Sequence, residues 1–315
     1  MQQRKHPNGK SINFNRWKTR FRGVSCMYQE LKQLKYSSSH IYKGIHVVEK
    51  LKLMCVLAHP DDESLGTGGA LAKYASEGVE TYLVTATRGE RGRIGDKRGH
   101  LDLATVGQIR EAELLAAAEI LGVREVQFLD YIDGDLDRAD VSEAVAKIVS
   151  HIRRVQPQVV ITFDANGSYG HPDHIAISQL TTAATVCAAD SSYKTLNDHA
   201  AHRVSKLYQM AWTRGKFEAY QAAFKDLKFN VDEVERRATP WPDWAITTFI
   251  DTVAYAPTVW QAVQCHQSQM SIYRELQHLS DEHHRALWGA QEFYRVFSLI
   301  NGGRQRETDL FEGLR

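Results

Sequence analysis

The chain has 315 residues and a formal net charge of +1, and its 43% apolar and 24% charged residues are ordinary for a globular protein with a substantial core. No run approaches the roughly 18 to 20 apolar residues that a membrane-spanning helix needs. Four well-separated cysteines without a C-x-x-C pair favour neither a disulfide framework nor a zinc ribbon, so we expect a cytoplasmic protein without a transmembrane segment.

The first 50 residues are strongly basic. They contain eleven Lys or Arg and two acidic residues, a charge of +9, which leaves −8 for the rest of the chain. This segment lacks the apolar core of about 7 to 15 residues that marks a secretory signal. We interpret residues 1–50 as a poorly ordered basic extension, with a transit peptide, a basic arm and an extension upstream of the true start as open alternatives. We expect no nucleic-acid partner.

From residue 52 onward, short apolar runs alternate with segments of helical periodicity. This β-α alternation with apolar strands predicts an α/β fold with a Rossmann-like, doubly wound, mostly parallel sheet. The expected strands are 52–58, 81–86, 126–129 and 159–163, and the expected helices are 66–78, 107–121, 141–155 and a fourth that follows the 164–174 loop and ends near 188.

Beyond residue 200 the periodicity is weaker, and we interpret this part as a C-terminal α+β cap region. The whole of 51–300 is expected to form one domain, followed by a C-terminal tail at 301–315. The expected elements of the cap region are strands at 206–212 and 245–250, helices at 214–225 and 257–270, and an edge strand at 293–297.

Two loops carry the densest groups of ligand-type side chains. The first strand ends in H-P-D-D-E at 59–63, and the fourth ends in D-A-N-G-S-Y-G-H-P-D-H at 164–174. In the doubly wound strand order 3-2-1-4 these two strands are neighbours, so both loops should meet at the switch point where such folds bind ligands. Three carboxylates within five residues repel one another unless a cation lies among them, which predicts a metal site.

Residue spacing limits which side chains can bind that metal. A catalytic zinc site takes about three His or carboxylate ligands and keeps one position open. His59 and Asp62 are three residues apart and can converge, and His171 and His174 have the same spacing. Since all four cannot bind while one position stays open, spacing leaves the ligand set undecided. Asp61 would point away from Asp62 and is the candidate general base.

Other interpretations of these segments have to be weighed. An acidic run can cap a helix, and a His-Pro-Asp-His turn can simply begin one, but the pairing of both on adjacent predicted strands favours a functional site. Gly66-Thr-Gly-Gly69, with Arg88, suggests an NADP-binding turn, yet it lacks the G-x-G-x-x-G pattern and follows carboxylates that would face a pyrophosphate. We interpret these glycines as allowing close helix packing.

The segments A-H-P-D-D-E-S, T-R-G-E and Y-G-H-P-D-H resemble the PIG-L (LmbE-like) family of zinc-dependent N-deacetylases, over residues 50 to 275. The likeness is greatest to the deacetylase and amidase branch of the mycothiol pathway. It implies a catalytic domain that hydrolyses an amide and removes an acetyl group from a small N-acetylglucosamine-type conjugate. An amidase acting on a thiol–sugar conjugate and a non-catalytic sugar- or metal-binding module are the alternatives.

The resemblance also implies which residues bind the metal. One Zn²⁺ per chain would be bound by His59, Asp62 and His174, with Fe²⁺ as the alternative metal in the cell. Asp61 would be the general base that acts on the attacking water. Glu63 is left to support a ligand or to cap the following helix.

Further roles concern the substrate. The resemblance implies that His171 stabilises the oxyanion or protonates the leaving amine, that Asp173 orients His171, and that Tyr169 assists at the carbonyl group. Arg110 would contact the polar head of the substrate. Arg88 begins a basic run that is either solvated or recognises an anionic or polyhydroxylated part of the substrate. The identity of the substrate and the oligomeric state are left open.

Overall fold

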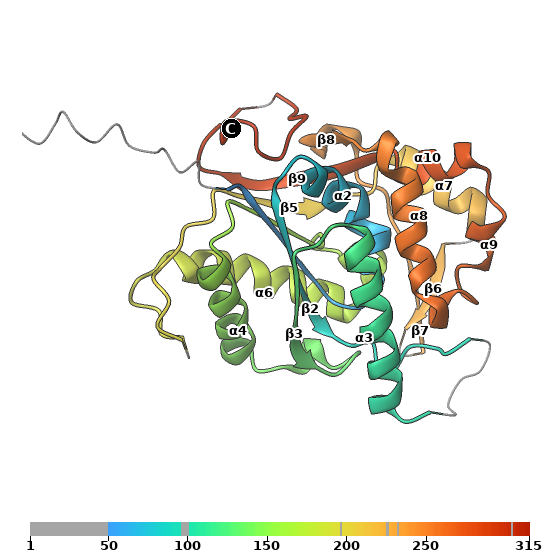
Figure 1. Cartoon of the computed structure of the whole chain (residues 1–315), viewed down its shortest axis with the longest axis horizontal. Coiled ribbons are helices and arrows are strands. Elements are labelled where there is room, and N and C mark those ends of the chain that lie inside the picture. Colours follow the sequence, from blue (N-terminus) through green and yellow to red (C-terminus); the bar gives the residue numbers. More distant parts are fainter. Residues whose placement is uncertain (1–49, 96–100, 196, 225–226, 232, 304) are drawn as a thin grey trace, which may run out of the picture. The chain divides into compact units, whose positions relative to one another are not determined.

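The computed structural model describes residues 50–315 except 96–100, 196, 225–226, 232 and 304 (Figure 1). The interpretation of the basic segment as an extension concerns residues outside the described part and stays a prediction. Residues Lys50–Arg315 form one contact unit. Among the described helices, none combines the length and the apolar character needed to cross a bilayer.

A mixed α/β fold is built around one large, mostly parallel sheet. Its strands are β1 (Lys52–Leu57), β2 (Glu80–Thr87), β3 (Glu125–Tyr131), β4 (Val159–Thr162), β5 (Lys206–Met210), β8 (Thr248–Asp251) and β9 (Ala290–Ser298). They are ordered β3-β2-β1-β4-β5-β9-β8, with the first five parallel and the last two antiparallel to their neighbours. The predicted adjacency of the first and fourth strands is confirmed.

Helices cover both faces of this sheet. They are α2 (Gly68–Ser76), which follows the π-helical turn η2 (Glu63–Thr67), α3 (Leu103–Ile120), α4 (Val141–Val155), α5 (Gly167–Gly170), α6 (Pro172–Ala189), α7 (Arg214–Phe224), α8 (Ala256–Cys265), α9 (Arg274–Gln277) and α10 (Asp281–Trp288). Helices α4 and α6 pack together on one side, and α3 packs with α8 on the other (Figure 1). Short 3-10 turns are η3 (Leu136–Arg138), η4 (Asp243–Ala245), η5 (Val253–Tyr255) and η6 (Gln267–Gln269).

The local sequence accounts for the central elements. Residues 53–57 of β1 are fully buried, as expected for a parallel strand with helices on both faces. Helix α4 begins where the side chain of Asp140 accepts a hydrogen bond from the backbone N–H of Glu143, and it ends before Gln156, which has a positive φ of 59°. Its bounds agree with the prediction from periodicity.

The glycines after the first loop pack against protein. A Cβ atom on Gly69 would lie 2.8 Å from Cβ of Thr252, and one on Gly66 would lie 2.7 Å from Sδ of Met210 in β5. Any larger side chain would push these elements apart. The interpretation of the glycines as close-packing residues therefore agrees with the structure, and their surroundings are protein side chains.

The structure differs from the expectation near the C-terminus. The last strand is not an edge strand, because β9 pairs with β5 on one side and β8 on the other. An additional hairpin, β6 (Lys228–Val231) with β7 (Val234–Arg237), was not predicted. Residues 301–315, expected to be a tail, are packed on the unit: Glu307 forms a bridge with Thr248, and Phe311 is fully buried.

Candidate active site

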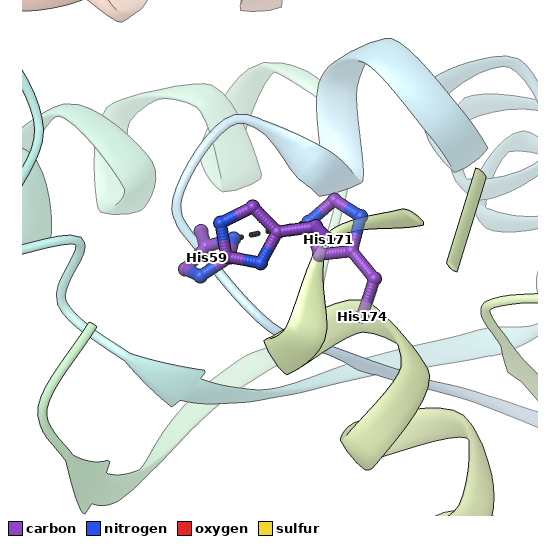
Figure 2. Close-up of side chains that lie close together, drawn as sticks. All are labelled: His59, His171 and His174. Atoms are coloured by element: carbon purple, nitrogen blue, oxygen red, sulfur yellow. Dashed lines mark hydrogen bonds between the residues drawn. The ribbon is translucent and has the colours of Figure 1, made fainter. Parts of the chain in front are cut away.

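The loops that follow β1 and β4 meet at the carboxyl ends of these strands. His59 comes from the loop after β1, whereas His171 and His174 lie at the start of α6, and the three imidazoles cluster (Figure 2). Nδ1 of His59 lies 3.1 Å from Nε2 of His174, and the ring centroids of His59 and His171 are 4.7 Å apart. The predicted meeting of the two loops is confirmed.

Backbone contacts hold the first loop in shape. The carboxylate of Asp62 turns back and accepts hydrogen bonds from the backbone N–H groups of His59 (2.7 Å) and Ala58 (3.2 Å). Asp61 has a positive φ of 92°, which is strained for a residue other than glycine and is frequent at functional sites. The two adjacent aspartates therefore point in different directions, as predicted.

Glu63 stabilises the first loop. Its carboxylate accepts a hydrogen bond from the backbone N–H of Asp61 (2.9 Å) and pairs with Nε2 of His266 (2.8 Å) at the end of α8. Both partners are fully buried, and although burial opposes it, the charge of Glu63 raises the pKa of His266. Of the two roles left open for Glu63, the structure favours support of the loop over helix capping.

His171 is oriented by backbone and not by the expected carboxylate. It caps α6, with Pro172 in the first turn, and its Nδ1 accepts a hydrogen bond from the backbone N–H of Asp173 (3.1 Å). The carboxylate of Asp173 instead accepts from the backbone N–H of Gly134 (2.7 Å) and contacts Nε2 of His59 (3.1 Å). The expected contact of this side chain with His171 is thus not present; Asp173 faces His59.

A second carboxylate, Asp133, was not singled out from the sequence. Its Oδ1 lies 3.1 Å from Nε2 of His59, on the same ring nitrogen that Asp173 contacts. Burial alone would lower the pKa of His59, but Asp133 and Asp173 outweigh it and raise the pKa. A histidine whose outer nitrogen faces a carboxylate presents its other nitrogen to a metal, as in many metal sites. Asp133 lies in the acidic loop after β3, and this loop is the sequence signal that could have identified it.

Three of the predicted ligands have the spacing that a metal ion needs. His59 Nδ1 lies 3.7 Å from Asp62 Oδ2, and His174 Nε2 lies 3.5 Å from Asp62 Oδ1. Together with the 3.1 Å between the two imidazoles, these distances are close to the roughly 3.3 Å that separates ligand atoms around tetrahedral Zn²⁺. His171 also has a ring nitrogen within 4.8 Å of those of His59 and His174, so geometry keeps it available as a ligand.

The charge of the site favours a cation. The carboxylates of Asp61, Asp62, Asp133 and Asp173 lie around the histidines, with Arg110 as a buried positive charge. Burial and the neighbouring carboxylates raise the pKa of Asp62 to about 7, although His59 opposes the rise. A divalent cation would reverse this shift and keep the carboxylate ionised. Donor set and electrostatics therefore both fit a metal.

Asp61 is held by two donors at one oxygen. Its Oδ2 accepts hydrogen bonds from Nη2 of Arg110 (3.0 Å) and from the hydroxyl group of Tyr273 (2.7 Å). The Arg110 guanidinium also donates to the backbone oxygens of Gly89 (2.9 Å) and Pro60 (2.7 Å). Arg110 lines the cavity, and its Nη1 and Nη2 are engaged by protein, whereas its buried Nε has no hydrogen-bond partner among the described residues. Tyr273 lies between η6 and α9 and had no sequence signal of its own.

Of the two remaining predicted residues, Tyr169 lines the cavity and Arg88 does not. Tyr169 lies in the cavity wall. Its ring makes T-shaped contacts with those of His171 and His174 and stacks on Phe229 with the centroids 4.1 Å apart. Arg88 is not among the described lining residues, because its guanidinium pairs with Glu111 and Asp130. The expected substrate contact of Arg88 is therefore not supported.

All the other predicted side chains except that of Asp173 line one open cavity of about 450 Å³. The lining contains the histidines and carboxylates, and the remainder is largely aromatic and aliphatic. The further lining residues are Leu65, Gly66, Phe163, Asp164, Ser168, Met210, Trp212, Tyr220, Phe224, Leu227, Lys228, Phe229, Thr239, Trp241, Gln269, Ile272 and Leu276. Most of them come from beyond residue 200, where the sequence pattern was weakest.

Comparison with known proteins agrees with this geometry. Residues 54–185 match the family described as PIG-L, GlcNAc-PI de-N-acetylase. A Kineococcus radiotolerans protein named 1D-myo-inositol 2-acetamido-2-deoxy-alpha-D-glucopyranoside deacetylase is 32% identical over 300 residues, covering 84% of this chain and 83% of that protein. A protein of the same name from Acidothermus cellulolyticus is 35% identical over 289 residues, covering 83% and 94%.

A solved structure shares the fold. The N,N′-diacetylchitobiose deacetylase from Pyrococcus horikoshii superposes with a TM-score of 0.60 and covers 87% of this chain and 92% of its own. At 17% identity this likeness concerns the fold alone. It is consistent with a mixed α/β architecture whose mostly parallel sheet positions the site.

Proposed function

The chain belongs to the PIG-L family of GlcNAc-PI de-N-acetylases, and on this premise we propose that it is a zinc-dependent hydrolase that removes the acetyl group from an N-acetylglucosamine-type substrate. As a deacetylase it is an amide hydrolase. The observation that carries the metal assignment is the convergence of His59 Nδ1, His174 Nε2 and the Asp62 carboxylate at mutual distances of 3.1 to 3.7 Å.

His59, Asp62 and His174 would hold the metal. When bound there, Zn²⁺ supplies Lewis acidity, which makes a water molecule acidic enough to react near neutral pH. Asp133 and Asp173 hold the ring of His59 by its outer nitrogen, and the loop backbone holds Asp62. The chain therefore fixes the orientation of His59 and Asp62 before any metal arrives.

Asp61 is proposed as the general base. Arg110 and Tyr273 occupy its Oδ2, so its Oδ1 is left to take a proton from the attacking water. Water adds to the amide carbon, the C–N bond breaks, and the proton passes to the departing nitrogen. The products are acetate and the free amine.

His171 is proposed to stabilise the negative charge on the carbonyl oxygen. Because its Nδ1 accepts a backbone hydrogen bond, a neutral His171 carries its proton on Nε2. Burial, with His59 nearby, lowers the pKa of His171 to about 4, which favours this neutral donor at pH 7. Tyr169 lies beside it in the cavity wall and is proposed to assist as a second donor.

We further propose a cytoplasmic enzyme with a small-molecule substrate and without a nucleic-acid partner. Cys55, Cys187 and Cys265 are free among the described residues, which suits a reducing compartment. The strand order and the lining of the cavity by residues beyond 211 support a Rossmann-like, doubly wound sheet with a C-terminal cap.

The test is a panel of N-acetylglucosamine conjugates assayed by release of the free amine, with a thiol–sugar amide included. The purified protein is depleted with a chelator and then reloaded with Zn²⁺ or Fe²⁺. We expect one metal ion per chain, loss of amine release on depletion and recovery on reloading. A metal-loaded protein that releases no amine from any conjugate would overturn the proposal.

A further inference from the structure

One wall of the cavity is a row of stacked aromatic rings. Trp212 and Tyr220 stack with their centroids 4.7 Å apart and their planes within 5°, and Phe224 continues the row 6.3 Å beyond Tyr220. Tyr220 is buried, whereas Trp212 and Phe224 are half-buried. We refer to these three residues as the aromatic row. It offers apolar ring surface within the cavity that contains the metal site.

The aromatic row begins close to the metal-binding loop. The hydroxyl group of Tyr220 lies 3.5 Å from the backbone oxygen of Leu65, which is three residues after Asp62. Phe229 of the β6–β7 hairpin also lines the cavity and stacks on Tyr169. A ligand held at the metal by one end could therefore extend its other end along apolar surface.

Two polar side chains of the cavity lining, Asp164 and Gln269, are engaged by protein. Asp164 accepts hydrogen bonds from the backbone N–H of Ser168 (2.6 Å) and from Nε1 of Trp241 (2.8 Å). Gln269 donates through Nε2 to the backbone oxygen of Arg93 (2.6 Å). A polyhydroxylated ring needs several hydrogen-bonding partners, since each unpaired polar group buried on binding lowers affinity.

We propose that the natural substrate carries an apolar aglycone, an alkyl or aryl group of several carbon atoms, that lies along the aromatic row. The inference rests on the proposed deacetylation and specifies its substrate class. An acetyl group has one methyl carbon to bury and does not need a wall built from the row, Phe229 and several aliphatic side chains. The aglycone distinguishes this substrate from the inositol conjugate named for the relatives.

The test uses the zinc-loaded full chain and N-acetylglucosamine glycosides with methyl, butyl, hexyl and octyl aglycones, in both anomeric forms. The p-nitrophenyl and inositol conjugates and methyl glycosides with longer N-acyl groups complete the panel. We expect kcat/KM for amine release to rise about two- to fourfold for each methylene that becomes buried, until the chain outgrows the cavity. The octyl and p-nitrophenyl glycosides should exceed the inositol conjugate.

Two variants of aromatic lining residues test the location of the aglycone. Trp212→Ala and Phe229→Ala should each flatten the dependence on chain length, so that the ratio of octyl to methyl kcat/KM falls at least fivefold, about the loss of one or two buried methylenes. Metal content and Tm are measured for both variants. If one of them is unfolded, the chain-length dependence of the other variant tests the inference. Trp244→Ala is the matched control, because Trp244 is 86% exposed and does not line the cavity; its ratio should equal that of the unchanged protein.

Three results would overturn the inference. The first is a kcat/KM that does not change with the length of the aglycone, and the second is a higher kcat/KM for the inositol conjugate. The third is a kcat/KM that rises when the N-acyl group is lengthened and not when the aglycone is. Each would mean that no apolar aglycone binds along the aromatic row. In all three cases the enzyme still releases amine, so the proposed deacetylation stands. If no glycoside releases amine from metal-loaded protein, the deacetylation proposal fails as well.

Discussion

The hydroxyl group of Tyr273 lies 2.7 Å from Oδ2 of Asp61, although the two residues are 212 positions apart in the chain. Arg110 Nη2 approaches the same oxygen at 3.0 Å. Because both donors contact Oδ2, they hold the carboxylate in one orientation. Oδ1 is then left for the attacking water. Tyr273 is thus a positioning residue for the proposed base.

Tyr273→Phe removes this donor and keeps the ring. A hydrogen bond to a charged group contributes about 1.5 to 3 kcal/mol, so we expect kcat to fall about tenfold or more while KM and metal content change little. Tyr255→Phe is the control, because its hydroxyl group contacts Ser76 at the surface (2.7 Å). If Tyr273 only supported folding, Tm would fall and kcat per metal-loaded molecule would not.

Asp61→Asn and His174→Ala should separate base from ligand. Asp61→Asn keeps the shape of the side chain but loses its basicity, and we expect normal metal content with turnover about 10² to 10⁴-fold lower. His174→Ala removes one of three ligands and should lose the metal itself, measured by elemental analysis after dialysis. Full metal content in His174→Ala would remove it from the ligand set and point to His171 in its place.

Arg110→Lys tests whether the guanidinium holds the loop. Arg110 is 4% exposed and donates to Gly89, Pro60 and Asp61, and one ammonium group at the end of a different stem cannot satisfy all three. We expect a destabilisation of about 3 kcal/mol in urea unfolding, together with reduced kcat. Arg124→Lys, a change at the exposed pair with Glu80, should alter stability by less than about 0.5 kcal/mol.

The sequence predicts the site residues whose positions depend on local sequence signals. These residues, His59, Asp62, His171 and His174, lie in the segments that follow β1 and β4, whose apolar runs are easily recognised. The β-α alternation places those strands side by side. Spacing could not choose among the four, because any of them can reach a common point. Only the resemblance favours one set, because the observed distances keep His171 available as well.

The missed residues reach the site through tertiary packing. Tyr273 lies in a short segment between η6 and α9, and Glu63 meets His266 over 203 positions, so neither contact leaves a periodic pattern. The same holds for β9, whose place inside the sheet depends on antiparallel pairing with β8 and β5. Long-range pairing is set by burial of whole faces and not by local propensity.

Glu307→Gln should destabilise the protein at neutral pH. Glu307 is 1% exposed and bonds Lys206 Nζ (2.8 Å), the Tyr208 hydroxyl group (2.7 Å) and Arg295 Nη1 (2.9 Å). Burial alone would raise the pKa of Glu307, but the hydrogen bonds from Lys206 and Tyr208 outweigh it and lower the pKa from 4.5 to about 2. A shift of this size corresponds to about 3 kcal/mol of stability.

The pH dependence follows from the direction of that shift. Between pH 4.5 and about 2 the unfolded chain binds a proton at Glu307 that the folded chain does not, so this stabilisation is complete above about pH 5 and is lost as the pH falls towards 2. Urea unfolding at several pH values should show the gap between the unchanged protein and Glu307→Gln narrowing through that window. Glu312→Gln, an exposed neighbour, should show no gap at any pH. A gap that stayed constant would mean that the carboxylate charge is not the source of the stability.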